Sequence, residues 1–193
     1  MTDKELIEEI LQHSSQKAFA MLVERYQELV VKTCKGFTNS YADAEDIAQE
    51  VFIEVFESLE GFRSEAKLST WIYRIAVNKS LNFVRKQKRE RLFRSIEGFF
   101  TAQNNDEEPM QIEDMGRNKP DSNIERSENK RMLKESINKL PENQRIAFIL
   151  SKYQDLSYKE IAEVMEVSLP SVESLLFRAK TNLQKHILSE MQK

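Results

Sequence analysis

Glycine and proline are scarce in this sequence, with four of each among 193 residues. Strands joined by tight turns need more of both residues, so their scarcity favours an all-α fold. Long apolar runs are missing as well, and the N-terminal segment MTDKELIEEI is too polar for a signal peptide. We therefore expect a helical protein that resides in the cytoplasm and does not insert into a membrane.

Cysteine and histidine are almost absent. The single cysteine, Cys34, excludes an internal disulfide, and its apolar surroundings in LVVKTCKGF predict a buried structural thiol. Neither His13 nor His186 belongs to a cluster of side chains with the spacing of a metal site. The sequence therefore predicts no metal, no cofactor and no catalytic constellation, and we expect the protein not to be an enzyme.

Charge is strongly segregated along the chain, although the net charge is only −3. Residues 42–60 carry seven acidic and no basic side chains, whereas residues 61–94 carry ten basic and two acidic side chains. A uniformly solvated surface does not require such blocks. Their presence raises the question of what each block binds.

Residues 95–127 interrupt the helical pattern. Apolar residues lose their period there, and two glycines and two prolines break any long helix. The segment is acidic and longer than ordinary loops. We predict two helical domains, residues 1–94 and 128–193, joined by a flexible acidic linker over residues 95–127.

Apolar residues recur at three-and-four spacing in the first domain and predict four helices. Their expected ranges are 3–12, 15–36, 42–59 and from after Ser69 to Arg94. In the second domain, Ser157 and Glu160 have the spacing of a capping box. A short helix, a tight turn and a last helix near 169–188 follow, which is a helix-turn-helix arrangement.

The last helix has two contrasting faces. Its apolar face comprises Val172, Leu175, Leu176, Ala179 and Leu183. The opposite side comprises Ser171, Ser174, Phe177, Arg178 and Thr181. Hydroxyls approach base edges and phosphates, arginine pairs with guanine, and an aromatic ring meets a thymine methyl. Helix spacing alone supports an ordinary surface helix equally well.

The basic helix carries a stripe made only of arginine and asparagine. Arg74, Asn78, Asn82 and Arg85 recur at helical spacing, and Glu90 is the only acid in the helix. Cations neutralise phosphate and asparagine offers the donor and acceptor that read a base edge. A polyanion partner is the better interpretation here than a solvated basic face. The preceding loop, between Phe62 and Trp71, could hold an unpaired base.

The acidic helix cannot face nucleic acid, because DNA repels it. Phe52, Ile53 and Phe56 widen its apolar surface beyond what its core stripe needs, and Ile53 lies among acidic neighbours. An acidic rim around exposed apolar groups suits a basic protein partner. Charge alone supports a solvated acidic face equally well.

Three segments together resemble a known family. DAEDIAQEVFIEVF, STWIYRIAVNKSLNFVRKQKR and LSYKEIAEVMEVSLPSVESLLFRAK, in this order, closely resemble the extracytoplasmic-function (ECF, group IV) sigma factors of bacterial RNA polymerase, within the sigma-70 family. The resemblance covers essentially the whole chain. It implies an alternative sigma factor that binds the β′ clamp and β subunits of core RNA polymerase and directs promoter-specific transcription initiation, while the polymerase does the chemistry. An anti-sigma factor is a further partner that it implies.

The resemblance also implies a task for each block. Residues 1–94 would be sigma region 2, whose acidic helix docks on the coiled coil of the polymerase β′ clamp. The matching residues here are Asp46, Gln49, Glu50, Phe52 and Ile53. The loop and basic helix would open the −10 promoter element and capture a flipped base of the non-template strand. The matching residues here are Ser64, Lys67, Ser69, Thr70, Trp71, Arg74, Asn78, Asn82 and Arg85.

Residues 128–193 would be sigma region 4, which reads the −35 element as duplex DNA in the major groove. The matching residues here are Ser168, Ser171, Val172, Ser174, Phe177, Arg178 and Lys180. The linker would thread through the polymerase, where its negative charge imitates nucleic acid. The chain departs from the family at Glu173 and Leu175, where a basic residue is common, and this leaves the exact −35 contacts open.

Two other interpretations of the residues compete with this one. A free-standing helix-turn-helix regulator would bind duplex DNA as a dimer, but it leaves the acidic helix and the loop beside Trp71 unexplained. A helical adaptor without a nucleic-acid role would make the arginine and asparagine stripe accidental.

Overall fold

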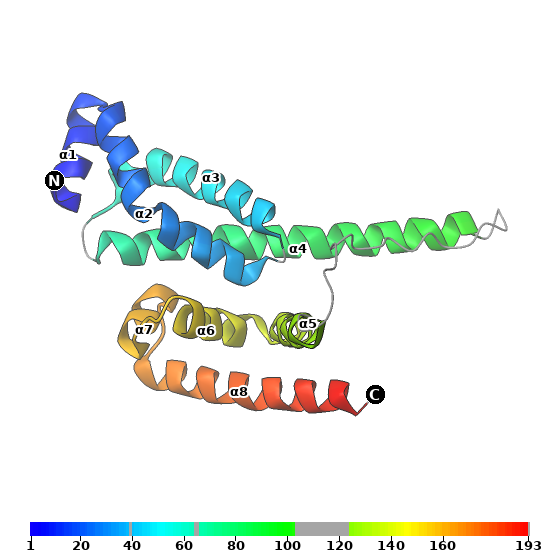
Figure 1. Ribbon diagram of the computed structural model, residues 1–193. Helices are drawn as coiled ribbons and strands as arrows, with labels where there is room; N and C mark the ends of the chain where they lie inside the picture. The colour runs from blue at the N-terminus through cyan, green and yellow to red at the C-terminus, as the bar shows by residue number, and fades with distance from the viewer. Residues whose placement is uncertain (39, 64–65, 103–123, 193) are drawn as a thin grey trace.

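The structure is a computed structural model that describes residues 1–38, 40–63, 66–102 and 124–192. These described residues form helices only, without a strand (Figure 1). The helices are α1 Asp3–His13, α2 Gln16–Phe37, α3 Tyr41–Ser58, the 3₁₀ helix η1 Leu59–Gly61, α4 Leu68–Ala102, α5 Ile124–Asn138, α6 Glu142–Tyr153, α7 Tyr158–Met165 and α8 Leu169–Met191. The all-α fold predicted from composition is confirmed.

Polar caps decide where the first helices begin. Thr2 and Glu5 form a capping box at α1. The Ser15 hydroxyl accepts a hydrogen bond from an amide in the first turn of α2, and the Ser40 hydroxyl does the same at α3. Each cap satisfies an amide that the first helical turn leaves without a partner. The second and third predicted helices are confirmed to within one residue at each end.

Helices α1 to α4 enclose a hydrophobic core, and we call them the N-terminal unit. Its fully buried side chains include Leu6, Leu22, Val30, Ile47, Val51, Val55, Leu59 and Ile72. Cys34 lies in the same core and is 0% exposed, as the sequence predicted. Burial raises the pKa of its thiol to about 11, because an apolar environment disfavours the thiolate.

Helix α4 begins and ends differently from the prediction. It starts at Leu68, so Ser69 lies in its first turn rather than before it, and it continues to Ala102 instead of ending at Arg94. Gly98 lies within this extension, because one glycine costs a helix only about 1 kcal/mol. At the other side of the predicted linker, α5 already begins at Ile124. The central part of that linker, residues 103–123, lies outside the described residues.

Helices α5 to α8 form the C-terminal unit. The predicted capping box is present: the Ser157 amide donates to the Glu160 carboxylate at 3.0 Å, and the Glu160 amide donates to the Ser157 hydroxyl at 3.3 Å. Glu166 ends α7 in the left-handed region, with φ 56°, and Ser168 caps α8. The predicted helix-turn-helix is therefore confirmed in α7 and α8.

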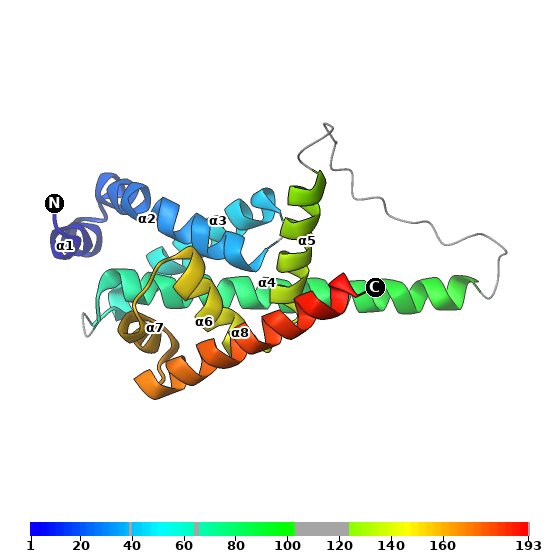
Figure 2. The same cartoon turned by 60° about the horizontal axis from the view of Figure 1, so that its bottom comes forward.

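The two units lie directly against each other. Helix α6 contacts α2, and α7 contacts α4. In Figure 1 the helices α6 and α7 lie between α4 and α8, and in Figure 2 α6 passes in front of α4. One hydrophobic cluster contains buried side chains from both units, and we call this contact the inter-unit interface. Its buried members include Phe37, Tyr73, Val77, Leu81, Ile146, Ile149, Leu150, Ile161 and Val164.

None of the helices built from the described residues combines the length and the apolar character needed to cross a bilayer. The same residues contain no group of three or more histidine, cysteine or carboxylate side chains arranged to bind a metal ion.

The burial of Cys34 predicts its reactivity. We expect a thiol reagent such as 5,5′-dithiobis(2-nitrobenzoate) to modify the folded protein at pH 8 at least a hundredfold more slowly than the protein in 6 M urea, because the folded thiol is both inaccessible and protonated. Absorbance at 412 nm measures both rates. Equal rates would contradict the buried position of the thiol.

The capping box predicts a pH dependence. The hydrogen bonds from Ser157 lower the pKa of the Glu160 carboxyl. Its stabilising contribution is therefore present above the pKa of this carboxyl in the unfolded chain, and it is lost as pH falls through the lower folded pKa. Glu160→Gln keeps the shape of the side chain and removes its charge. We expect it to reduce the free energy of unfolding at pH 7 by about 0.5 kcal/mol.

Urea titrations of the wild type and Glu160→Gln at pH 7 and pH 2.5 test this expectation. The difference between the two proteins should decrease at pH 2.5, because the carboxyl takes up a proton as the pH falls. A difference that stays constant between the two pH values would contradict the role of the charge.

Candidate nucleic-acid interface

Two large apolar side chains project from the acidic helix α3. Ile53 is 58% exposed and Phe56 is 56% exposed. The Phe56 ring meets Phe19 of α2 edge to face, with 5.0 Å between the ring centroids. These three side chains line an apolar groove that Gln49 and Glu57 border. The groove suits an apolar contact, and its acidic border favours a basic partner.

The structure brings most of the predicted polymerase-binding residues to this groove or beside it. Asp46, Gln49, Glu50 and Ile53 are all exposed on α3. Phe52 is only 8% exposed and belongs to the core, where it lies at the floor of the groove. Its main contribution is therefore to support the groove from below.

The predicted strand-binding stripe on α4 faces the C-terminal unit. The Arg74 guanidinium donates to the Glu163 carbonyl at 2.7 Å and forms an ion pair with Glu166 at 2.7 Å. Arg85 binds the Glu142 carboxylate through two hydrogen bonds of 2.6 and 3.1 Å. Two of the four stripe residues are thus held by carboxylates of the other unit.

The asparagines of the stripe lie between these arginines and are exposed. Asn82 accepts a hydrogen bond from Arg85 at 3.4 Å. Asn78 lines a cleft between the two units, together with Asn143 and Glu166. The spacing predicted from the sequence therefore produces one continuous polar surface, although the C-terminal unit covers part of it.

The loop before α4 forms a small aromatic site. Phe62 and Trp71 lie 5.2 Å apart between ring centroids, and both line a cavity of about 170 Å³ with Arg63 and Arg74. Lys67 is exposed and lies 3.8 Å from the Glu160 carboxylate. Aromatic rings beside cations suit an unpaired nucleotide base and its phosphate.

Not every predicted residue of this loop faces the cavity. Ser69 is half-buried, and Ser64 lies outside the described residues. Thr70 is only 3% exposed, because it shares a helical face with the buried Tyr73 and Val77. The predicted DNA contact of Thr70 is therefore corrected to a structural position.

Helix α8 presents the predicted duplex-binding surface to solvent, on the side of the C-terminal unit away from α4 (Figure 1). Phe177 is 72% exposed, and Ser174, Arg178 and Lys180 are exposed around it. At the start of the helix, the Ser168 and Ser171 hydroxyls lie 2.8 Å apart. These side chains offer hydroxyl, cationic and aromatic groups on one helix that can enter a major groove.

Two positions on α8 qualify the prediction. Val172 is 0% exposed and packs in the core with Leu176, so its predicted contact with DNA is corrected to a core position. Glu173 is exposed beside Ser174. Its carboxylate therefore lies on the surface that would meet DNA, where it repels phosphate or accepts from a cytosine amino group.

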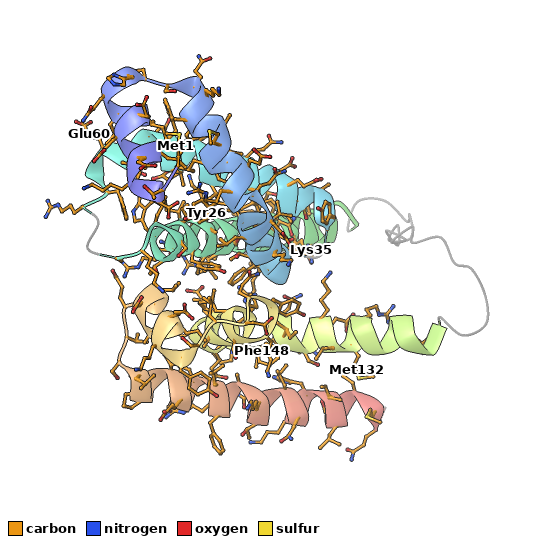
Figure 3. All side chains as sticks on the ribbon, turned by 60° about the vertical axis from the view of Figure 1, so that its left-hand side comes forward. Met1, Tyr26, Lys35, Glu60, Met132 and Phe148 are labelled. Atoms are coloured by element: carbon orange, nitrogen blue, oxygen red, sulfur yellow. The ribbon has the colours of Figure 1, made fainter. Side chains whose placement is uncertain are left out.

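Burial at the inter-unit interface alters two ionisable groups. Arg145 is 7% exposed, and its guanidinium lies 5.7 Å from the centroid of the Phe37 ring. Burial lowers the pKa of Arg145. Burial raises the pKa of Tyr73 to about 12, with a smaller contribution from Glu160. Figure 3 shows side chains filling the space between the helices of the two units.

Sequence reasoning missed the oxygen atoms of the C-terminal unit that contact the stripe. Glu142 lies 57 positions from Arg85 along the chain, and the Glu163 carbonyl lies 89 positions from Arg74. No local spacing rule relates such positions. The only available signal was the charge segregation, which showed that acids and bases occupy separate segments but did not show which segments meet.

Two family models match the chain. Sigma-70 region 2 matches residues 22–90, and sigma-70 region 4 matches residues 130–183. These ranges contain the acidic helix, the basic stripe and the helix-turn-helix.

Curated relatives match over nearly the full length. The ECF RNA polymerase sigma-E factor of Haemophilus influenzae is 34% identical over 187 residues, which cover 97% of this chain and 96% of the relative. The protein of the same name from Escherichia coli K12 is 33% identical over 191 residues, covering 97% and 95%.

Solved structures agree on the fold. CnrH, solved in complex with the cytosolic domain of CnrY, superposes with a TM-score of 0.66 at 21% identity, covering 97% of both chains. The sigma factor RpoE from Bartonella quintana, solved in complex with the anti-sigma factor NepR, superposes with a TM-score of 0.57 at 21% identity, covering 89% of this chain and 97% of that one. Together, the family models and the relatives exclude the free-standing regulator and the adaptor.

Proposed function

Because the chain belongs to the extracytoplasmic-function family of RNA polymerase sigma factors, we propose how three surfaces of this alternative sigma factor divide promoter-specific initiation. The N-terminal unit, with the domain boundary near residue 94, binds polymerase and the −10 element. The C-terminal unit, from about residue 128, binds the −35 element. Catalysis belongs to the polymerase, and the sigma factor acts in the cytoplasm.

The observation that carries the proposal is the exposed apolar groove on the acidic helix. Ile53 and Phe56 are more than half exposed, which is costly on a surface that has no partner. Asp46 and Glu50 lie one helical turn apart beside them. Burial of Ile53 and Phe56 supplies affinity, and the carboxylates select a basic surface. We assign this groove to the β′ clamp of core polymerase.

The stripe on α4 and the aromatic site beside it serve the −10 element. Arg74 and Arg85 neutralise phosphates of the non-template strand, and Asn78 and Asn82 contact base edges. Trp71 stacks at the edge of the opened duplex, and Lys67 and Ser69 contact the backbone of a captured nucleotide. Ser64 belongs to the same loop by sequence.

Helix α8 serves the −35 element as duplex DNA. Phe177 and Arg178 contact base edges in the major groove, and Ser174 and Lys180 contact the backbone. Ser168 and Ser171, at the helix N-terminus, bind phosphate. Glu173 restricts which DNA base can lie opposite it, because its carboxylate can accept a hydrogen bond only from a base with an exposed amino group.

An anti-sigma factor is the partner that regulates access to these surfaces. Bartonella quintana RpoE was solved with the anti-sigma factor NepR, and CnrH with CnrY. In this chain the groove around Ile53 and Phe56 is an apolar target that remains open. We assign it to the anti-sigma factor as well as to polymerase, so that the two compete.

Charge reversal tests the assignment of the groove. We expect Asp46→Lys/Glu50→Lys to weaken binding to core polymerase at least tenfold, because two attractive charges become repulsive. The matched control is Glu24→Lys/Glu28→Lys, which makes the same change on exposed positions of α2. Fluorescence anisotropy of labelled sigma factor titrated with core polymerase measures the affinity of each variant. Equal weakening by the two variants would overturn the assignment.

Removal of one asparagine tests the assignment of the stripe. We expect Asn78→Ala to reduce promoter opening about tenfold, since one base-edge contact is worth about 1–3 kcal/mol, while binding to core polymerase stays within twofold. Permanganate reactivity of promoter thymines measures opening in the reconstituted holoenzyme. Equal loss of opening and of polymerase binding would contradict this division of labour.

A further inference from the structure

The C-terminal unit places acids where the proposed promoter strand would place phosphates. The Glu142 carboxylate binds Arg85 through two hydrogen bonds, and the Glu166 carboxylate lies 2.7 Å from Arg74. The Glu160 carboxylate lies 3.8 Å from Lys67. We call these three carboxylates the acidic face of α6 and α7. Bidentate carboxylate and phosphate contacts use the same arginine geometry.

Apolar contacts fix the acidic face in this position. Tyr73 and Val77, on the buried side of α4, lie in one cluster with Ile146 and Val164 of the C-terminal unit. The Tyr73 hydroxyl also lies 3.5 Å from Gln154. A single strand of DNA cannot bind both Arg74 and Arg85 while this cluster is closed, because carboxylates of the C-terminal unit hold the two guanidinium groups.

Several features keep the closed arrangement weak enough to open. The Nε atoms of Arg74 and Arg145 are buried without a hydrogen-bond partner, which costs free energy. The Arg85–Glu142 ion pair is partly exposed, with 59% and 39% of the two side chains accessible. Exposed ion pairs of this kind contribute little to stability, and salt screens them.

The surfaces proposed for the first steps of initiation remain open in the same arrangement. Ile53 and Phe56 are exposed on α3, and Phe177 is exposed on α8. Polymerase can therefore dock on the closed protein, whereas Arg74 and Arg85 of the strand-binding stripe become free to bind phosphate only after the units separate.

We propose that the acidic face of α6 and α7 is a binding surface for the stripe of α4, and that it holds the free sigma factor closed by imitating the phosphates of the promoter strand. The inference rests on the proposed function, because it needs the stripe to be the strand-binding surface. Its consequence is an order of events: docking on polymerase precedes binding of the −10 strand, and the free protein does not capture single strands elsewhere.

Neutralising the acidic face tests the proposal without altering the stripe. The variant is Glu142→Gln/Glu166→Gln in the full chain. Its matched control is Glu128→Gln/Glu135→Gln, which removes two charges from exposed positions on α5 of the same unit. Small-angle X-ray scattering measures the radius of gyration. Anisotropy measures affinity for a labelled single strand that carries the non-template −10 segment of a promoter transcribed by the wild type with core polymerase.

We expect the neutralised variant to have a larger radius of gyration and at least tenfold tighter binding to the single strand, and the control to match the wild type in both. Unchanged dimensions, or expansion without tighter binding, would overturn the proposal.

A second variant opens the interface without any change of charge. A Cβ atom on Gly36 of α2 would lie 2.5 Å from the Ile149 Cγ2 of α6, so Gly36→Ala disrupts the contact between the two units. Alanine also favours the helix itself. The control for scattering is Gly61→Ala, where a Cβ atom meets nothing within 4 Å. Gly36→Ala should expand the protein and tighten strand binding as the first variant does, and failure to do so would count against the proposal.

Transcription with core polymerase separates this proposal from the proposed function. If the wild type supports promoter-specific transcription but neither variant binds the single strand more tightly, only the proposal of a closed state is overturned. If the wild type itself supports no promoter-specific transcription, the proposed function is overturned.

Discussion

Helix α4 is buried from two sides, and the rest of the structure depends on this constraint. Ile72 and Ala76 pack in the core of the N-terminal unit, while Tyr73, Val77 and Leu81 pack against the C-terminal unit. Ile72 and Ala76 lie on one face of the helix, and the three residues that contact the C-terminal unit lie on the adjacent face. The polar stripe follows Tyr73, Val77 and Leu81 by one position and so lies beside the contact with the C-terminal unit. The position of that unit therefore decides whether Arg74 and Arg85 are free.

Local rules predicted much of the fold. Apolar spacing predicted α2 and α3 to within one residue at each end, and the capping box at Ser157 located the helix-turn-helix. The predicted end of α4 was wrong, because one glycine lowers the stability of a helix by only about 1 kcal/mol and does not by itself end a long helix. The start of α5 was missed, since its sequence is polar and has little apolar period.

The candidate surfaces were predictable as faces but not as individual contacts. Ile53 and Phe177 are exposed as their positions suggested, whereas Thr70 and Val172 share the faces of buried neighbours. A motif carried over from a family includes residues that support a surface along with residues that contact a ligand. The ion pairs across the inter-unit interface join distant segments, and only the arrangement of the two units shows which acids meet which bases.

The distance between α4 and α7 tests the account most directly. Spin labels at the exposed positions Lys86 and Lys159, introduced as cysteines beside the buried Cys34, allow double electron–electron resonance in the free protein and in the complex with core polymerase and promoter DNA. The account predicts one narrow distance distribution in the free protein and a longer distance in the promoter complex. The same distribution in both states would contradict it.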